Sequence, residues 1–205
     1  MCFLFVGLLN HAANVPGYII TNEDDTIHGF VRVSSSSHMT VNLPSSINSF
    51  DTYNFALTFR KHDEKLYKQY YPSSIKEFNF LYKSTNFIFK RFTLKYKSIV
   101  KSEDTRDQFL CLLYSDNEYQ LYRNVLIDPN NGLISIPDKY LKYMIYYLYS
   151  SEKGIVKVEK SKKYNTIQAL LLDNNFNPAF VAGLDKKLDF IDIKDILKQY
   201  HNSKN

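Results

Sequence analysis

The chain has few cysteines and few glycines, and each of these shortages excludes a class of functional site. Its 205 residues include two cysteines, Cys2 and Cys111, and six glycines. Two cysteines this far apart lack zinc-ligand spacing. The sequence also has no phosphate-binding glycine loop, no nucleotide-binding fingerprint and no GxSxG turn of a serine hydrolase. We therefore expect no cofactor and no metal ion, and we assign no catalytic residue.

Long hydrophobic runs are missing as well. No stretch approaches 18 uninterrupted apolar residues, so we expect no transmembrane helix. Residues 1–9, MCFLFVGLL, are apolar and lead into Asn10-His11-Ala12-Ala13. This order is typical of the hydrophobic stretch and cleavage region of a secretory signal peptide. The alternative is a buried first strand or a short core helix, because nine residues cannot cross a bilayer.

A basic residue normally opens a signal peptide, whereas the first one here, histidines aside, is Arg32. We interpret residues 1–13 as a partial signal peptide of an exported protein, periplasmic or associated with the outer membrane. After its removal Cys111 would be alone, so no intramolecular disulfide could form. Fold stability must then come from the hydrophobic core. Cys111 lies in the apolar run Leu110–Leu113 and is expected to be a buried, unreactive thiol.

Tryptophan is absent, yet 17 tyrosines and 15 phenylalanines make the chain rich in the aromatics that favour strands. Apolar and polar residues alternate, or apolar residues cluster, in nine segments that we predict to be strands: 18–21, 27–33, 55–60, 78–82, 92–96, 109–114, 119–123, 144–149 and 155–159. Short polar segments between them predict hairpin turns. The continuous apolar run at 109–114 predicts a strand that is covered on both faces.

The period of the pattern changes only near the end of the chain. Tyr164, Ile167 and Leu170 recur at helical spacing, and the same spacing returns over 193–200, where Asp192 can cap the helix. We predict an α+β fold, mainly an antiparallel sheet (sandwich or open-barrel-like) with two short C-terminal helices. Residues 14–160 would form the β-rich domain, and residues 161–205 a helical segment packed on it.

Acidic residues are scarce in the middle of the chain. Residues 65–101 contain nine basic side chains and one acid, Glu77, a net charge of +8, whereas the whole chain carries +5 and the remainder therefore −3. Cations interleaved with aromatic rings can bind nucleic acid, anionic envelope glycans or lipid head groups. The candidate binding residues are Lys83, Lys90, Arg91, Lys95 and Lys97. The alternative is that these lysines form the solvated face of an amphipathic strand.

Two acidic clusters, Glu23–Asp25 and Asp116–Glu118, offer oxygen ligands, but neither has the spacing of a calcium loop. Both lie where a hairpin needs a polar turn, so we expect them to serve as turns.

Four segments resemble a group of uncharacterised exported proteins common in Bacteroidetes-type bacteria. Residues 17–29, GYIITNEDDTIHG, are similar to the family's GYI.T..GDTI.G opening, although Asp24 stands where the family usually has Gly. Residues 71–78, YPSSIKEF, are similar to its Y.P..I..F segment. The other two likenesses are Phe109-Leu110 with Tyr119–Tyr122, and Leu170–Asp173 with Asp192–Tyr200. The resemblance implies an N-terminal signal, a Gram-negative envelope location and a β-rich body, and it supplies no catalytic residue.

The leading hypothesis is an exported cell-envelope protein that binds without catalysis, its partner being an anionic envelope polymer or another envelope protein. An envelope hydrolase that uses carboxylate or histidine chemistry is the alternative, and a pocket holding His28, His38 or His62 beside a carboxylate would favour it. An intracellular nucleic-acid-binding protein is the weaker alternative. No nucleic acid is expected, because lysine dominates over arginine in the basic segment and export would separate the protein from it.

Overall fold

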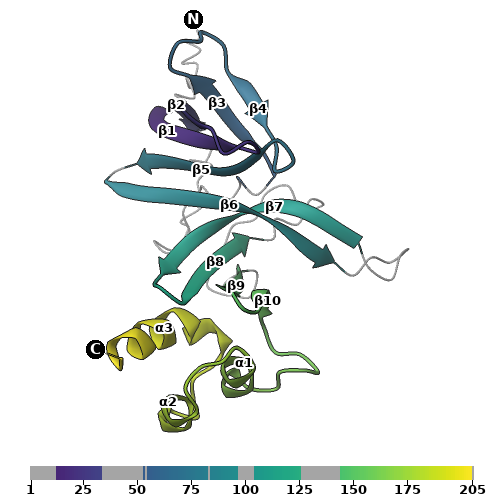
Figure 1. Ribbon diagram of the computed structural model, residues 1–205, viewed down its shortest axis with the longest axis vertical. Coiled ribbons are helices and arrows are strands. Elements are labelled where there is room, and N and C mark those ends of the chain that lie inside the picture. Colours follow the sequence, from purple (N-terminus) through teal and green to yellow (C-terminus); the bar gives the residue numbers. More distant parts are fainter. Residues whose placement is uncertain are drawn as a thin grey trace, which may run out of the picture.

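Ten strands and a group of short helices make up the part of the chain that the computed structural model describes, residues 13–33, 53, 55–82, 84–96, 104–125 and 144–204. The strands are β1 (Ala13–Thr21), β2 (Thr26–Val33), β3 (Leu57–Lys61), β4 (Lys68–Tyr70), β5 (Ile75–Tyr82), β6 (Thr85–Tyr96), β7 (Asp104–Ser115), β8 (Tyr119–Val125), β9 (Met144–Ser150) and β10 (Gly154–Val158). They form a single open sheet (Figure 1). The predicted α+β fold with a mainly antiparallel sheet is confirmed.

The strands are added to the sheet first toward one edge and then toward the other. Strands β1 to β4 follow one another outward, and the chain then returns so that β5 pairs with the free side of β1. From β5 the strands continue as a meander to β10, so that the order is β10-β9-β8-β7-β6-β5-β1-β2-β3-β4 with antiparallel neighbours. The long strands β6 and β7 cross the middle of the molecule, with β1–β4 above and β8–β10 below (Figure 1).

The acidic clusters act as turns, as expected. Strands β1 and β2 pair as the predicted hairpin, and in their turn the Thr21 hydroxyl accepts hydrogen bonds from the backbone N–H groups of Glu23 and Asp25 at 3.2 and 3.3 Å. Between β7 and β8 the Asp116 carboxylate accepts the N–H groups of Glu118 and Tyr119 at 2.8 and 2.7 Å. Both clusters therefore lie in tight turns, the first stabilised by the preceding Thr21 hydroxyl and the second by the cluster's own Asp116 carboxylate.

Phenylalanine rings fill the core on one face of β1–β7. Phe78 on β5 stands opposite Phe89 on β6, with ring centroids 4.6 Å apart, and Phe109 on β7 meets Phe78 edge-on at 4.9 Å. All three side chains are fully buried, and Cys111 beside them is 3% exposed. The predicted burial of the Cys111 thiol is confirmed. Leu110 is also fully buried, so β7 is covered on both faces at Phe109–Cys111 as predicted, whereas residues 112–114 are only partly buried.

The helices cover one face of β8–β10. They are α1 (Ile167–Asp173), α2 (Pro178–Gly183), the 3₁₀ turn η4 (Phe190–Asp192) and α3 (Ile193–Asn202). Helices α1 and α3 correspond to the two that were predicted, whereas α2 was missed because Asn177-Pro178 is typical of a loop that ends a helix. There the Asn177 side chain caps α2 by accepting the N–H groups of Ala179 and Phe180, and Pro178 occupies the first turn.

Aromatic contacts attach the helical segment to the sheet. Tyr119 of β8 stacks on Phe176 with a centroid distance of 4.2 Å, and its hydroxyl donates to the carbonyl of Asn174 at 2.9 Å. Asp192 occupies the N-cap position of α3, but its carboxylate accepts the N–H of Asp189 at 2.8 Å instead of capping α3.

In the described ranges, no helix has the length and hydropathy needed to span a membrane. Residues 1–12, most of the expected signal peptide, lie outside those ranges.

Candidate functional site

The candidate site is a pocket of about 490 Å³ on the side of the sheet that the helices leave open. Successive residues of a strand face opposite sides of a sheet. Leu121 of β8 and Leu148 of β9 pack beneath the helices, so their neighbours Tyr122 and Tyr149 face the other side, where they line the pocket. Alternation along β8 and β9 thus places the helix-covered core on one face and, on the other, a smaller core of Leu94, Leu110, Tyr122 and Tyr147 that borders the pocket.

Three aromatic rings form one wall of the pocket. Phe92 lies 4.7 Å from Tyr122 and 5.9 Å from Tyr149, measured between ring centroids. The Tyr122 hydroxyl donates a hydrogen bond to the Gln120 side chain, which also lines the pocket. Burial, with smaller effects from Glu77 and Tyr149, raises the pKa of Tyr122 well above its ordinary value, so its hydroxyl is neutral at physiological pH.

A carboxylate and an ammonium group meet in the centre of the pocket. Glu77 on β5 stands directly opposite Lys90 on β6, and the Lys90 Nζ lies 3.7 Å from the Glu77 Oε2. The Tyr18 hydroxyl donates to the other carboxylate oxygen at 3.1 Å. Burial, together with the charge and the hydrogen bond of Glu77, raises the pKa of Tyr18. Glu77 is therefore held from two sides.

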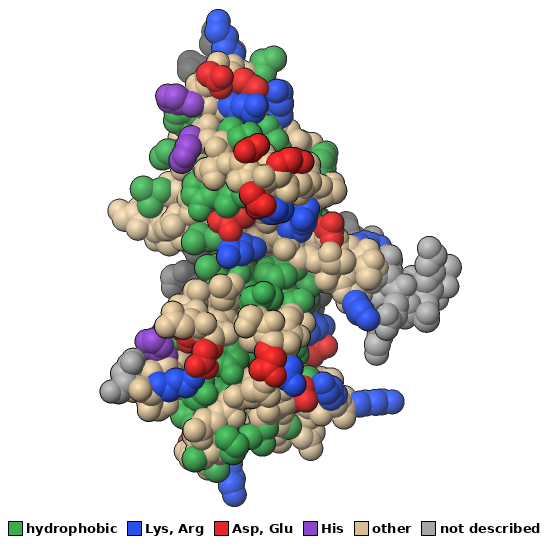
Figure 2. Space-filling view, in the orientation of Figure 1, with side chains coloured by type: hydrophobic (Ala, Val, Ile, Leu, Met, Phe, Trp, Pro, Cys, Tyr) green, Lys and Arg blue, Asp and Glu red, His purple; other side chains and the backbone are tan. Residues whose placement is uncertain are grey.

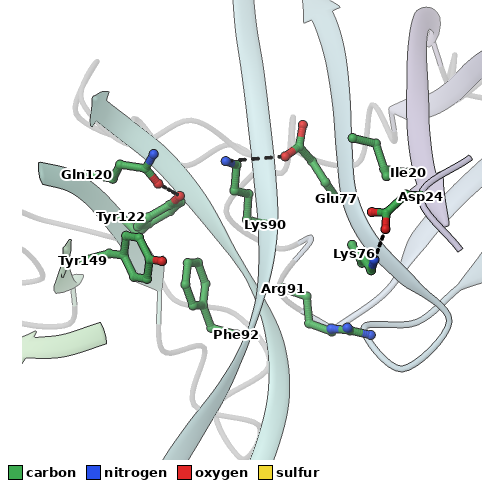
Figure 3. Close-up of a pocket in the computed structure, with 10 residues that line it drawn as sticks. All are labelled: Ile20, Asp24, Lys76, Glu77, Lys90, Arg91, Phe92, Gln120, Tyr122 and Tyr149. Atoms are coloured by element: carbon green, nitrogen blue, oxygen red, sulfur yellow. Dashed lines mark hydrogen bonds and ion pairs between the residues drawn. The ribbon is translucent and has the colours of Figure 1, made fainter. Parts of the chain in front are cut away.

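The far end of the pocket is lined by Asp24 of the β1–β2 turn, Lys76 of β5 and Arg91 of β6. Lys76 pairs with Asp24 of the β1–β2 turn at 2.7 Å. Arg91 donates from one guanidinium nitrogen to the Asn22 side chain at 2.8 Å and to the Pro72 carbonyl at 3.2 Å. In Figure 3 the aromatic rings gather at one end, Lys76 and Asp24 lie at the other, and Glu77 and Lys90 point toward each other between them.

The structure brings together two of the five candidate binding residues. Lys90 and Arg91 line the pocket, whereas Lys95 is exposed further along β6 and is not part of the lining. Alternation also places Lys90 and Lys95 on opposite faces of their strand. Lys83 and Lys97 lie outside the described residues. On the face shown in Figure 2, basic and acidic side chains are intermixed, so this view shows no continuous basic strip.

Sequence reasoning missed most of the pocket, namely Ile20, Asp24, Lys76, Phe92, Gln120, Tyr122 and Tyr149, and noted Glu77 only as the lone acid of the basic segment. Most of them lie in the segments 17–29, 71–78 and 119–122 that carry the family resemblance, but the resemblance assigns none of them a role. One signal was available for Glu77, because opposite charges on neighbouring hairpin strands predict a cross-strand pair once the register is known. The aromatic residues give no comparable signal, since an alternating strand places aromatics in cores and sites alike.

His28 and His62 lie beside aromatic rings rather than in the pocket. The His28 ring lies 6.1 Å from the Tyr18 ring, and the His62 ring lies 5.5 Å from the Phe30 ring. Neither lines the pocket, and His38 lies outside the described residues. The described side chains also contain no group of three or more His, Cys, Asp or Glu residues that could hold a metal ion.

The chain matches no protein-family model, no curated protein and no solved structure. The chemistry of the pocket must therefore be argued from its own residues. Ring faces beside a few converging polar and charged groups can hold a polar ligand that also has apolar surface.

Proposed function

We propose that the protein is an exported cell-envelope protein that binds a glycan in this pocket without chemically changing it. The observation that carries the proposal is the aromatic wall at Phe92 and Tyr149 beside the Glu77–Lys90 pair. A sugar ring has C–H faces that pack on aromatic rings and hydroxyl groups that bond to charged and amide side chains. The pocket volume of about 490 Å³ is in the range of sites for small ligands.

The cell-envelope location is supported by the apolar residues 1–9 and by the resemblance of residues 17–29 to exported proteins. The test is to fractionate cells that make the native protein and to sequence its N-terminus. We expect a processed chain in the periplasm or with the outer membrane. An intact Met1 in the cytoplasm would refute export.

Binding can be tested by titrating purified protein with soluble oligosaccharides released from bacterial envelopes and measuring heat. We expect Tyr149→Ala to weaken the affinity about two- to tenfold, because one aromatic packing contact contributes about 0.5–1.5 kcal/mol. Tyr71→Ala is the matched control, since Tyr71 is 51% exposed and is not part of the pocket lining. Equal losses in both variants would contradict the proposed site.

A hydrolase is the second candidate, and the observation in its favour is that Asp24 and Glu77 line the same pocket. Glycoside hydrolysis commonly uses two carboxyl groups. We place it second because each carboxylate already pairs with a lysine, Asp24 with Lys76 and Glu77 with Lys90. Release of reducing sugar from the same oligosaccharides, abolished by Glu77→Gln, would establish the hydrolase instead of the binding protein.

A further inference from the structure

We infer that the ligand of this pocket is an acidic saccharide whose sugar ring carries a carboxylate, an inference that rests on the proposed glycan-binding function. The first observation is the charge of the lining. Three cations, Lys76, Lys90 and Arg91, line the pocket with two carboxylates, Asp24 and Glu77. This lining has a net charge of +1, which one ligand carboxylate would neutralise.

The excess positive charge belongs to Arg91. Its two hydrogen-bond partners are neutral oxygens, the Asn22 side chain and the Pro72 carbonyl, and no carboxylate in the described part of the chain pairs with it. Both bonds come from the same nitrogen, Nη1. A guanidinium group has five N–H donors in a fixed fork that matches a carboxylate. Arg91 therefore retains donors for an anionic ligand, but it leaves β6 on the opposite face from Lys90 and Phe92, so it acts at the end of the pocket near Lys76 rather than beside Lys90.

Lys90 is the second cation that can turn toward a ligand. The 3.7 Å between the Lys90 Nζ and the Glu77 Oε2 is longer than a hydrogen bond, whereas the 2.7 Å between the Lys76 Nζ and the Asp24 Oδ2 is a hydrogen-bond distance. The Lys90 side chain is 36% exposed and that of Glu77 is 16% exposed, so the ammonium group lies on the solvent side of the pair. Lys90 can contact a ligand carboxylate without breaking a hydrogen bond, while Glu77 keeps its bond from Tyr18.

The position of Phe92 sets the orientation of the sugar. Lys90 and Phe92 are two residues apart on β6, so their side chains lie on the same face of the sheet, about 7 Å apart along the strand. That spacing fits one sugar ring with its exocyclic carboxylate. A ring packed on Phe92 therefore places its carboxylate at Lys90.

The test compares trigalacturonic acid with the trisaccharide made by reducing its carboxyl groups to alcohols, each titrated calorimetrically into the full chain. We expect the acidic sugar to bind about tenfold more tightly at low ionic strength, the effect of two partly exposed ion pairs. The preference should disappear near 1 M salt, where the screening length is about 3 Å.

Lys90→Gln and Arg91→Gln should each weaken the binding of the acidic sugar by a larger factor than the binding of the neutral sugar, so that the preference for the acidic sugar shrinks. Lys95→Gln is the control, because Lys95 is an exposed lysine of the same strand that does not line the pocket. Equal affinities for the two sugars would overturn this inference and leave the proposed glycan binding intact. Failure of both sugars to bind would overturn both the acidic-ligand inference and the proposed glycan binding. A preference for the acidic sugar that persists at high salt would refute the electrostatic basis of the inference.

Discussion

Replacing Asp116 should destabilise the fold, because this one carboxylate joins the β7–β8 turn to its surroundings. Its oxygens accept hydrogen bonds from the backbone N–H groups of Glu118 and Tyr119 and from the Tyr114 hydroxyl at 2.9 Å. The His201 Nδ1 of α3 lies 3.9 Å from the same carboxylate, whose side chain is 10% exposed. The turn therefore depends on an acceptor that is largely shielded from water.

The expected cost of Asp116→Ala is about 2–4 kcal/mol of unfolding free energy. A hydrogen bond to a charged group contributes about 1.5–3 kcal/mol, and two of the three donors, Tyr114 and Tyr119, are not fully exposed. Asp116→Asn should cost only about 1 kcal/mol, because its amide oxygen can still accept both backbone N–H groups and only the acceptor for Tyr114 is lost. Urea unfolding of the three proteins measures both differences.

The same carboxylate gives the prediction a pH dependence. Burial acts to raise the pKa of Asp116, but the hydrogen bonds from Tyr119, Glu118 and Tyr114 and the proximity of His201 outweigh it, so the pKa lies below its ordinary value. Its stabilising contribution is therefore full above the unfolded carboxyl pKa of about 3.9 and is lost as the pH falls through the lower, folded value.

The stability difference between the wild type and Asp116→Asn should accordingly shrink below about pH 4, where the protonated side chain resembles an amide. Tyr114→Phe provides a check, since it removes one of the three bonds and retains the carboxylate. An Asn variant as unstable as the Ala variant at pH 7, or a difference independent of pH, would refute the assignment of the turn to the Asp116 oxygens.

Two further predictions concern the core. Gly17→Ala should lower the free energy of unfolding in urea by at least about 2 kcal/mol, because the new Cβ would overlap the backbone carbonyl of Asn79. Gly154→Ala should cost only about 1 kcal/mol, because Gly154 has a φ of +70° but open space around it. A larger loss at Gly154 than at Gly17 would contradict this account. In a Cys2→Ser background the Cys111 thiol, 3% exposed, should react with a thiol reagent only as fast as the protein unfolds, and rapid reaction in the native state would disprove its burial.

Alternation predicted most of the sheet because one face of each strand is buried. Phe78 and Phe80 identify β5, and their partners Phe89 and Phe87 lie opposite them on β6. The predicted strand at 92–96 covers only the end of β6, which begins at Thr85. Strand β4 was missed because its three residues, Lys-Gln-Tyr, form an edge with little apolar character. Short edges have too little buried surface to leave a pattern.

The pocket could not be predicted in the same way, because it joins residues that only the twisted sheet brings together. Phe92 and Tyr122 contact each other at 4.7 Å although β7 separates their strands in the sheet. A right-handed twist turns neighbouring strands relative to one another, so side chains of β6 and β8 can converge over β7. Neither the strand order nor the twist is encoded in a local stretch of residues.

Phenylalanine and tyrosine side chains occupy different parts of this sheet, and the difference bears on where the site lies. The fully buried core beneath β1–β7 uses Phe78, Phe89 and Phe109, rings that need no hydrogen-bond partner. The other face of β8 and β9 carries the fully buried Tyr122, whose hydroxyl donates to Gln120, and the partly buried Tyr149, which lines the pocket. Helices cover the opposite face of these two strands, while this face has a small hydrophobic core of its own, formed by Leu94, Leu110, Tyr122 and Tyr147. Phe92 and Tyr149 pack against the edge of this small core and are only partly buried, so the part of each ring that stays exposed in the pocket is available to a ligand.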